Sequence, residues 1–375
     1  MKKMLFVFGT RPEAIKMIPV VNKLRNNRYC VKVCTTGQHK EMLQQVLDMF
    51  SIKPDFELEL MKQNQSLSDI TSSVLQGVDK ILLAEKFDMV FVHGDTSTAF
   101  ATSLAAFYHK LPVAHIEAGL RTYNLYNPWP EEANRQLISK LTKYHFAPTT
   151  EAAKNLHREG VENNVIITGN TVIDALYFVL NEIIYPNEKE LKEKLVNTYP
   201  KLNNVFQSRY ILVTGHRRET FGLDFIEICQ ALKQIALSNH NIYVVYPVHL
   251  NPYVQNVVRE ILGDVNNICL LPPLPYLEFV FLMKNSYLII TDSGGIQEEA
   301  PSLGIPVLVT RKTTERIEAL QAGTIRLVGV NKDDICDIVQ QYLTDNQLYC
   351  AKQTNPYGDG KASDRILEYL NDIFE

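Results

Sequence analysis

The fold is decided by the stretch Tyr287-Leu288-Ile289-Ile290-Thr291-Asp292-Ser293-Gly294-Gly295-Ile296-Gln297-Glu298-Glu299, in which an apolar run leads into a helical pattern through two glycines. This order is typical of a strand, a tight turn and a helix in an α/β sheet. We expect Ser293, Gly294 and Gly295 to present unpaired backbone N–H groups at the helix start, where the helix dipole favours an anion such as phosphate. An ordinary glycine turn before a solvated acidic helix is the simpler alternative.

Glu299 lies about one helical turn beyond Gly295 and therefore faces the same predicted anion site. A carboxylate cannot serve the phosphate itself. We therefore assign Glu299 to a neighbouring pair of hydroxyl groups, such as those of a ribose.

The same alternation of short apolar runs and amphipathic, helix-length stretches extends along the whole chain. It predicts an α/β fold of two doubly wound Rossmann-like domains with parallel, helix-covered sheets. The predicted strands are 5–8, 31–35, 89–92, 113–116, 145–147 and 165–167 in the first half, and 210–213, 242–246, 268–270, 287–290, 306–309 and 325–327 in the second.

We place the first domain at residues 1–170 and the second, nucleotide-binding domain at residues 171–360. A helical pattern at 171–184 is followed by charged, Asn- and Pro-rich sequence up to 205, which indicates linker and surface. The amphipathic helix within 361–375 is expected to cross back onto the first domain. Two such domains place a ligand crevice between them, at the carboxyl ends of both sheets.

Composition excludes several classes of partner. The 375 residues carry a formal net charge of −4 and no Lys/Arg cluster, so no nucleic-acid partner is expected. No apolar stretch approaches membrane-spanning length, so no membrane partner is expected either. The six cysteines lack the short paired spacings of zinc or redox sites, which predicts reduced thiols and a cytoplasmic location.

Polar residues follow the predicted strands of the first domain. Arg11 and Lys16 come after the first strand and can meet an anion, because Pro12 suits the first position of a helix. Asp95 and Glu117 end two successive strands, so we expect both carboxylates to project toward one crevice. No G-x-G-x-x-G pattern follows a strand, so no nicotinamide cofactor is predicted.

A further segment, PWPEEANR at 128–135, opens a helix with carboxylates in its first turn. Glu131 is our third candidate acid, although such residues also serve as ordinary helix-start charges. We include Arg135 among the candidates for substrate binding.

A metal site is the main competing interpretation of the first domain. His93, Asp95, His115 and Glu117 include ligand types suited to zinc or manganese. Histidines just before a strand end are as readily buried core groups, however, and no cysteine or further histidine completes a set. We therefore predict no metal.

The second domain carries charged loops after its strands as well. His216 follows one strand and can donate to, or exchange a proton with, a bound group. His249 lies in a similar but weaker position. Arg316 belongs to a charged loop with Arg311 and Glu315, for which an exposed ion pair is the simpler explanation.

Eight ordered segments closely resemble the bacterial non-hydrolysing UDP-N-acetylglucosamine 2-epimerases. They are GTRPEAIKM (9–17), GDT (94–96), EAGLRT (117–122), PWPEEANR (128–135), GNTVID (169–174), GHRRE (215–219), DSGGIQEEAPSLG (292–304) and NPYGDG (355–360). The resemblance runs from the first strand to the last helix.

The resemblance implies a two-domain fold of the glycosyltransferase B type and interconversion of UDP-N-acetylglucosamine and UDP-N-acetylmannosamine through 2-acetamidoglucal, for surface polysaccharide synthesis. It also implies a homodimer and no cofactor. Its implied catalytic residues are Asp95, Glu117, Glu131 and His216. Its implied nucleotide contacts are Arg11, Ser293, Gly294, Gly295, Glu299 and Arg316, with Phe279 near the uracil.

Several alternatives share most of these motifs. A hydrolysing 2-epimerase would release free N-acetylmannosamine and UDP, and a related enzyme would use a UDP-diacetamido sugar. A glycosyltransferase of the same fold would need an acceptor, and a nucleotide-sugar sensor would bind without turnover. Which carboxylate is the base on which face of the sugar stays open at this level.

Overall fold

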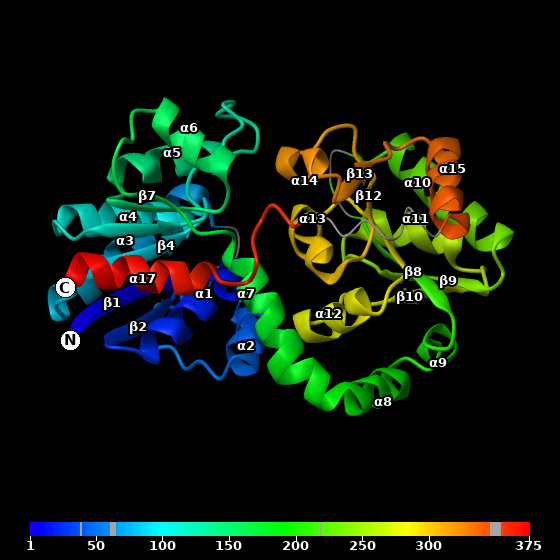
Figure 1. Ribbon diagram of the computed structural model, residues 1–375, viewed down its shortest axis with the longest axis horizontal. Coiled ribbons are helices and arrows are strands. Elements are labelled where there is room, and N and C mark those ends of the chain that lie inside the picture. Colours follow the sequence, from blue (N-terminus) through cyan, green and yellow to red (C-terminus); the bar gives the residue numbers. More distant parts are fainter. Residues whose placement is uncertain (38–39, 61–64, 216, 218–219, 346–353) are drawn as a thin grey trace. The chain divides into compact units, whose positions relative to one another are not determined.

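The computed structural model describes residues 1–37, 40–60, 65–215, 217, 220–345 and 354–375. The chain forms two compact units. Unit 1 comprises Met1–Phe178 and Tyr357–Glu375, and unit 2 comprises Val179–Pro356. Each unit is a parallel sheet covered by helices, which confirms the predicted pair of α/β domains (Figure 1). The sequence placed the boundary after residue 170, whereas the contacts place it after Phe178.

The sheet of unit 1 has the strand order β3-β2-β1-β4-β5-β6-β7. Its strands are β1 (Lys2–Phe8), β2 (Tyr29–Thr35), β3 (Phe56–Glu57), β4 (Met89–His93), β5 (Val113–Ile116), β6 (Tyr144–Ala147) and β7 (Val165–Ile167). Its helices are α1 (Arg11–Arg25), α2 (Lys40–Met49), α3 (Leu67–Ala84), α4 (Ser97–Tyr108), α5 (Glu131–Leu141), α6 (Thr150–Arg158), α7 (Thr171–Phe178) and α17 (Ala362–Phe374).

The centre of this sheet is apolar on both faces. Residues 4–8 of β1 are fully buried, as expected for a parallel strand covered by helices on both sides. The rings of Phe6 and Phe91 stack with centroids 4.2 Å apart, and Phe146 continues the stack at 6.5 Å from Phe91. Three different strands are thereby joined through one aromatic row.

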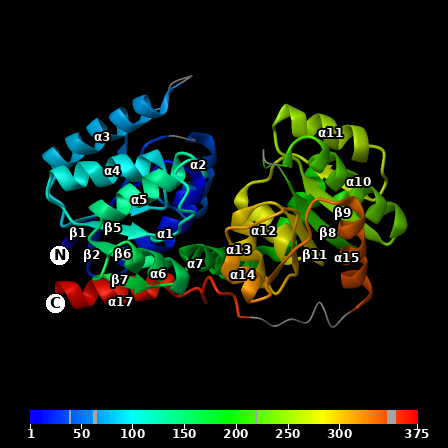
Figure 2. The same cartoon turned by 90° about the horizontal axis from the view of Figure 1, so that it is seen from above.

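Helix α17 returns to unit 1 (Figure 2), where it packs against α1. Its Ile366 and Leu370 are buried, and the ring of Tyr369 lies 6.0 Å from that of Phe146. The carboxylate of Asp174 accepts hydrogen bonds from the backbone N–H groups of Ala362 (3.2 Å) and Ser363 (2.7 Å). This carboxylate satisfies donors that the start of a helix leaves open.

The sheet of unit 2 has the strand order β10-β9-β8-β11-β12-β13. Its strands are β8 (Arg209–Thr214), β9 (Ile242–Pro247), β10 (Ile268–Leu271), β11 (Leu288–Thr291), β12 (Val307–Val309) and β13 (Ile325–Leu327). Its α-helices are α8 (Glu188–Thr198), α9 (Leu202–Val205), α10 (Leu223–Ser238), α11 (Pro252–Leu262), α12 (Tyr276–Lys284), α13 (Gly294–Glu299), α14 (Ile317–Gln321) and α15 (Lys332–Thr344). Shorter helical turns span Val179–Ile184, Tyr185–Asn187 and Ala300–Leu303.

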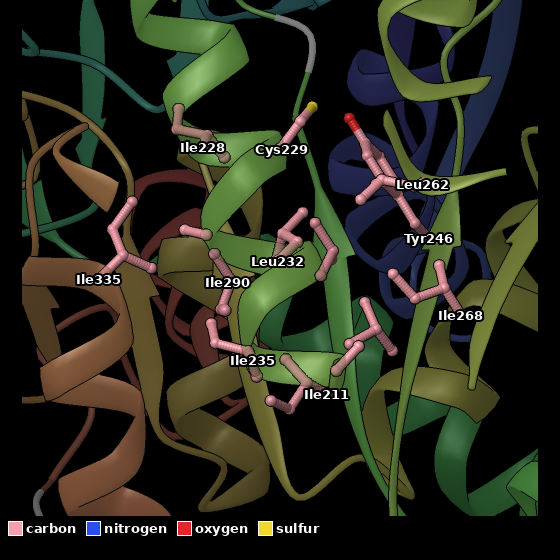
Figure 3. Close-up of a cluster of buried hydrophobic side chains, with 14 of the residues drawn as sticks. Ile211, Ile228, Cys229, Leu232, Ile235, Tyr246, Leu262, Ile268, Ile290 and Ile335 are labelled. Carbon is pink, nitrogen blue, oxygen red and sulfur yellow. The ribbon is translucent and has the colours of Figure 1, made fainter. Parts of the chain in front are cut away.

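One face of α10 contributes to a hydrophobic core of unit 2. Figure 3 shows Ile228, Leu232 and Ile235 from this helix facing the strands, where they meet Ile211 and Ile290. Their spacing along α10 is the three-and-four-residue repeat of an amphipathic helix. The core therefore fixes α10 against β8 and β11.

One sequence prediction needs correction, and one strand was missed. The region up to residue 205 was predicted as linker and surface, but it contains α8 and α9. Leu191 and Leu195, one turn apart, are buried, so this charged helix has an apolar face. The two-residue strand β3 was not predicted, because a run of that length carries no periodicity.

None of the helices within the described ranges is long and apolar enough to cross a membrane.

Candidate active site

Three loops follow neighbouring strands at the carboxyl edge of the unit 1 sheet. They follow β1, β4 and β5 and lead to Arg11, Asp95 and Glu117. The strand order reverses between β1 and β4, which is the position where open α/β sheets bind their ligands. The topology therefore brings together the residues that the sequence marked as separate junctions.

Glu117 is the most closely held of the predicted acids. Its carboxylate forms an ion pair with the Lys16 ammonium, and its Oε2 accepts a hydrogen bond from Asn170 Nδ2 at 3.1 Å. His93 Nε2 lies 3.6 Å from the same oxygen. The backbone of Glu117 has φ +64°, a left-handed conformation that costs about 1–3 kcal/mol in a residue other than glycine. Such strain persists only where surrounding contacts impose it.

These neighbouring groups determine the charge state of Glu117. Burial raises the pKa of Glu117, but the Lys16 ammonium and the His93 imidazole lower it more, so this pKa lies well below its ordinary value. The carboxylate is therefore ionised at neutral pH and is a weak base. Its negative charge is available to a positive centre nearby.

His115 does not join Glu117. Its Nε2 lies 2.7 Å from the carbonyl oxygen of Gly94, and burial lowers the pKa of His115 to about 3. The ring is thus neutral and donates Nε2–H to that carbonyl. His115 therefore supports the loop that carries Asp95. Within the described residues, no group of three or more His, Cys, Asp or Glu side chains could hold a metal ion.

The start of α5 holds the Asp95 loop from the other side. Arg135 forms an ion pair with the carboxylate of Asp95, and Asn134 Nδ2 donates to the Asp95 carbonyl at 2.9 Å. Glu132 Oε2 lies 3.4 Å from Arg135 Nη1 and fixes the guanidinium. Arg135, predicted as a substrate contact, is therefore also the partner of a candidate catalytic acid.

Glu131 and Glu132 are adjacent but have different environments. Glu132 is fully buried and accepts backbone hydrogen bonds from Thr122 (2.9 Å) and Tyr123 (3.0 Å). Glu131 is half-buried, and within the described ranges its carboxylate makes no hydrogen bond or ion pair. Glu131 is therefore the member of this pair that is open to a ligand.

Glu13 was not predicted, although the pattern Thr10-x-x-Glu13 is a capping box. Its buried carboxylate accepts from the backbone N–H groups of Gly9 (3.1 Å) and Thr10 (2.8 Å), and from the hydroxyl of Thr96 (2.6 Å). One side chain thus joins the loop before Arg11 to the loop that contains Asp95.

In unit 2 the corresponding loops follow β8 and β11, which are adjacent at the reversal of strand order. Asp292, after β11, accepts the backbone N–H of Arg217 at 2.8 Å, and the hydroxyl of Tyr246 donates to the Gly215 carbonyl at 2.7 Å. The residues on both sides of position 216 are therefore anchored. His216 itself lies outside the described residues.

The expected row of unpaired N–H groups is wrong at its first member. The backbone N–H of Ser293 donates to the Thr291 hydroxyl at 2.9 Å, because that side chain folds back over the turn. Gly294 and Gly295 begin α13, and a β-carbon on Gly294 would lie 3.1 Å from Arg316 Nη2. The guanidinium of Arg316 is therefore next to this turn.

Arg316 is held by acids of its own unit. Its Nη2 and Nε lie 2.7 and 2.8 Å from Glu298 Oε1, and its Nη1 lies 3.1 Å from Glu315 Oε1. Burial by itself raises the pKa of Glu315. The positive charges of Arg316 and Arg311 have the larger, opposite effect, so the pKa is lowered to about 2. The exposed ion pair considered for this loop is therefore a partly buried network.

The remaining predicted residues of unit 2 are Glu299, Phe279 and His249. Glu299 is buried at the end of α13, and its Oε2 accepts a hydrogen bond from the Tyr276 hydroxyl at 2.6 Å. Phe279 is half-buried on α12. His249 is exposed beyond the end of β9, and its Nδ1 accepts the Asn251 N–H at 3.1 Å.

Comparison with known proteins identifies the group to which this arrangement is similar. A family model described as "UDP-N-acetylglucosamine 2-epimerase" matches residues 22–371. The chain is 53% identical to the UDP-N-acetylglucosamine 2-epimerase of Campylobacter jejuni (98% of this chain, 97% of the relative). It is 54% identical to that of Escherichia coli strain K12 (98% of each).

A crystal structure of the UDP-GlcNAc 2-epimerase from Neisseria meningitidis, bound to UDP-GlcNAc, matches with a TM-score of 0.90 and 49% identity over 99% of this chain and 100% of that one. Together with the two parallel-sheet units, this match confirms the predicted fold of the glycosyltransferase B type.

Replacing Lys16 with methionine is expected to lower the free energy of unfolding at pH 7 by about 3–5 kcal/mol, because a buried carboxylate loses its partner. Glu117 has a lowered pKa when folded, so its stabilising contribution exists above its ordinary pKa and is lost as pH falls through the lowered value. In Lys16→Met, burial dominates and raises this pKa. The destabilisation should therefore be smaller at pH 5 than at pH 7, measured by chemical denaturation.

The matched control is Lys23→Met on the same helix, because Lys23 forms an exposed ion pair with Asp364. Such pairs contribute about 0–1 kcal/mol to stability, so the free energy of unfolding of Lys23→Met should stay close to the wild-type value at either pH. Equal destabilisation of Lys16→Met at the two pH values would contradict the assigned charge state.

Proposed function

The chain belongs to the UDP-N-acetylglucosamine 2-epimerase family, and on that premise we propose that it interconverts UDP-N-acetylglucosamine and UDP-N-acetylmannosamine without hydrolysis. The observation that carries this proposal is the group of acids at the carboxyl edge of unit 1. Glu117 is ionised beside Lys16, Asp95 is paired with Arg135, and Glu131 is open to a ligand.

The reaction explains why several acids are needed. Carbon 2 of the sugar is not next to a carbonyl group, so its proton is only weakly acidic. When the bond between carbon 1 and the UDP oxygen breaks, positive charge develops on carbon 1 and acidifies that proton. UDP leaves with the bonding electrons, a base takes the proton, and 2-acetamidoglucal forms. UDP then adds back to carbon 1 while carbon 2 is protonated on the opposite face.

Within unit 1 we assign different tasks to the three acids. Glu117 stabilises the positive charge on carbon 1, because its lowered pKa makes it a poor proton acceptor but a persistent anion. Asp95 and Glu131 transfer the protons on the two faces of the sugar. Lys16 and Arg135 are then both partners of these acids and contacts for the substrate.

We assign the UDP part of the substrate to unit 2, together with Arg11 of unit 1. Gly294 and Gly295 let a phosphate approach the backbone, and the guanidinium of Arg316 beside them supplies positive charge. Glu299 accepts from the ribose hydroxyls, and Phe279 stacks near the uracil. His216 is assigned to the diphosphate on the resemblance, and His249 is assigned to the substrate from its place after β9. Charge developing on the leaving oxygen is what such preorganised donors stabilise.

The fate of the product follows from retention of UDP. A nucleotide sugar remains activated at carbon 1 and suits a glycosyltransferase, so we infer a role in surface polysaccharide synthesis. The five cysteines of the described residues are free thiols, and four have their pKa raised by burial. Reduced thiols support a cytoplasmic location.

We also propose a homodimer, formed through unit 1. Leu83 at the end of α3 and Phe107 and Tyr108 at the end of α4 are 73%, 56% and 64% exposed. The two helices pack against each other, and His109 after α4 lies 2.7 Å from Asp79 of α3. Both helices end at the amino edge of the sheet, so pairing there leaves the acids of the carboxyl edge uncovered.

Incubation with UDP-N-acetylglucosamine in deuterium oxide should yield UDP-N-acetylmannosamine that carries deuterium at carbon 2, detected by proton NMR. Exchange is expected because carboxylate protons equilibrate with solvent during elimination and re-addition. Free N-acetylmannosamine with UDP as the main product would instead identify a hydrolysing enzyme, and absence of deuterium would exclude the proposed proton transfers.

Asp95→Asn and Glu131→Gln should each lower kcat by roughly 10²–10⁴-fold, because an amide cannot transfer the proton. The affinity for UDP, measured by calorimetry, should change little, because UDP is assigned to other residues. The matched control is Glu151→Gln, which alters a partly exposed acid in the first turn of α6. Wild-type turnover in Asp95→Asn would remove that residue from the mechanism.

Light scattering should give a molar mass about twice 42.8 kDa for the wild type. Phe107→Glu should shift the mass toward that of the monomer, because a charge in an apolar interface is left without a partner. A monomeric wild type at micromolar concentration would contradict the homodimer.

A further inference from the structure

Helix α12 carries two side chains that bear on the nucleotide. Tyr276 occupies its first position and Phe279 lies three residues further on, so the two share one face of the helix. Phe279 is half-buried, whereas Tyr276 is buried at 7% exposure. Phe279, which is assigned to the uracil, and Tyr276 therefore lie within one turn of α12.

The hydroxyl of Tyr276 donates to Glu299 Oε2 over 2.6 Å, and both residues are buried. The other oxygen of this carboxylate, Oε1, lies 3.7 Å from the position that a β-carbon on Gly295 would take. Tyr276 thus holds one oxygen of this carboxyl group, and the other oxygen lies near the glycine turn assigned to the phosphate. A separation of 2.6 Å is at the short end of the range for O–H···O hydrogen bonds, and such a bond restricts the rotation of the carboxyl group.

Other buried tyrosines of unit 2 make a different kind of bond. Tyr210 donates to the carbonyl of Leu282 at 2.6 Å, and Tyr246 donates to the carbonyl of Gly215 at 2.7 Å. Those hydroxyls complete the bonding of backbone groups. Tyr276 instead orients a side chain that the sequence and the family resemblance both mark for ligand binding.

We propose that Tyr276 is a positioning residue for nucleotide recognition: it fixes the Glu299 carboxylate so that the site selects a ribose over a deoxyribose. This inference rests on the proposed function, which assigns Glu299 to the ribose hydroxyls. A carboxylate of fixed orientation rejects an analogue that lacks the hydroxyl, because its buried oxygen is then left unsatisfied. A carboxylate free to rotate can find another donor and discriminates less.

The test measures affinities for UDP, 2′-deoxy-UDP and 3′-deoxy-UDP by calorimetry. The wild type should bind at least one deoxy analogue about tenfold more weakly than UDP. Tyr276→Phe should reduce this ratio severalfold by weakening UDP binding while leaving the affinity for that deoxy analogue nearly unchanged. If the Tyr276 hydroxyl only stabilises the packing of α12 against α13, Tyr276→Phe would instead lower the affinities for all three ligands by the same factor.

Tyr210→Phe is the matched control, because it removes a buried hydroxyl with a 2.6 Å bond from the same unit. It should leave the discrimination ratio at the wild-type value. Thermal unfolding of each variant establishes that it is folded before the affinities are compared.

A double-mutant cycle covers the case in which Tyr276→Phe folds poorly. Glu299→Gln should reduce the ratio by itself, because an amide nitrogen replaces or competes with the acceptor. Tyr276→His offers a second substitution, since its shorter ring cannot reach Glu299 in the same way. Either Tyr276 variant should have no further effect on the ratio in the Glu299→Gln background.

The outcomes separate the inference from the function beneath it. Loss of discrimination in Glu299→Gln but not in the Tyr276 variants would overturn the positioning role and leave the ribose assignment standing. A wild type that binds UDP without discriminating its deoxy analogues would overturn the ribose assignment of Glu299 and this inference with it. A wild type that does not bind UDP would overturn the proposed function.

Discussion

Parallel pairing makes every strand of a sheet end at the same edge, and both units depend on this constraint. In unit 1 it gathers the loops after β1, β4 and β5, and in unit 2 it gathers those after β8 and β11. The strand order reverses between β1 and β4 and between β8 and β11, so the loops there diverge and leave room for a ligand. The buried, apolar strands supply the stability that lets these loops carry charged residues.

The second constraint is that a buried charge needs a partner. Two adjacent pairs of glutamates show how the chain meets it. Glu132 and Glu298 are buried and hold Arg135 and Arg316, whereas their neighbours Glu131 and Glu299 are the residues assigned to the substrate. Adjacent residues of a helix point about 100° apart, so one carboxylate can serve the framework while the next serves the ligand.

Local periodicity predicted most of the strands, because a parallel strand buried on both faces is a short apolar run between turns. The strands at 113–116, 165–167 and 325–327 match their predicted bounds. Helix α8 was missed because its apolar face consists of few residues among many charges, and Glu13 was missed because its capping role hid its contact with Thr96. His115 was an open alternative as a metal ligand, and only its bond to the Gly94 carbonyl assigned it to the framework.

The sequence by itself determined the alternation of strands and helices, the polar residues at the strand ends and the family resemblance, because each depends on neighbouring residues or on ordered motifs. The tertiary structure alone decided which acids are paired. Lys16 and Glu117 are 101 positions apart in the chain, and Asp95 and Arg135 are 40 apart. No local pattern encodes such a contact, since it arises only when parallel strands bring their ends to one edge. The charge state of Glu117 and the orientation of Glu299 are therefore properties of the folded chain.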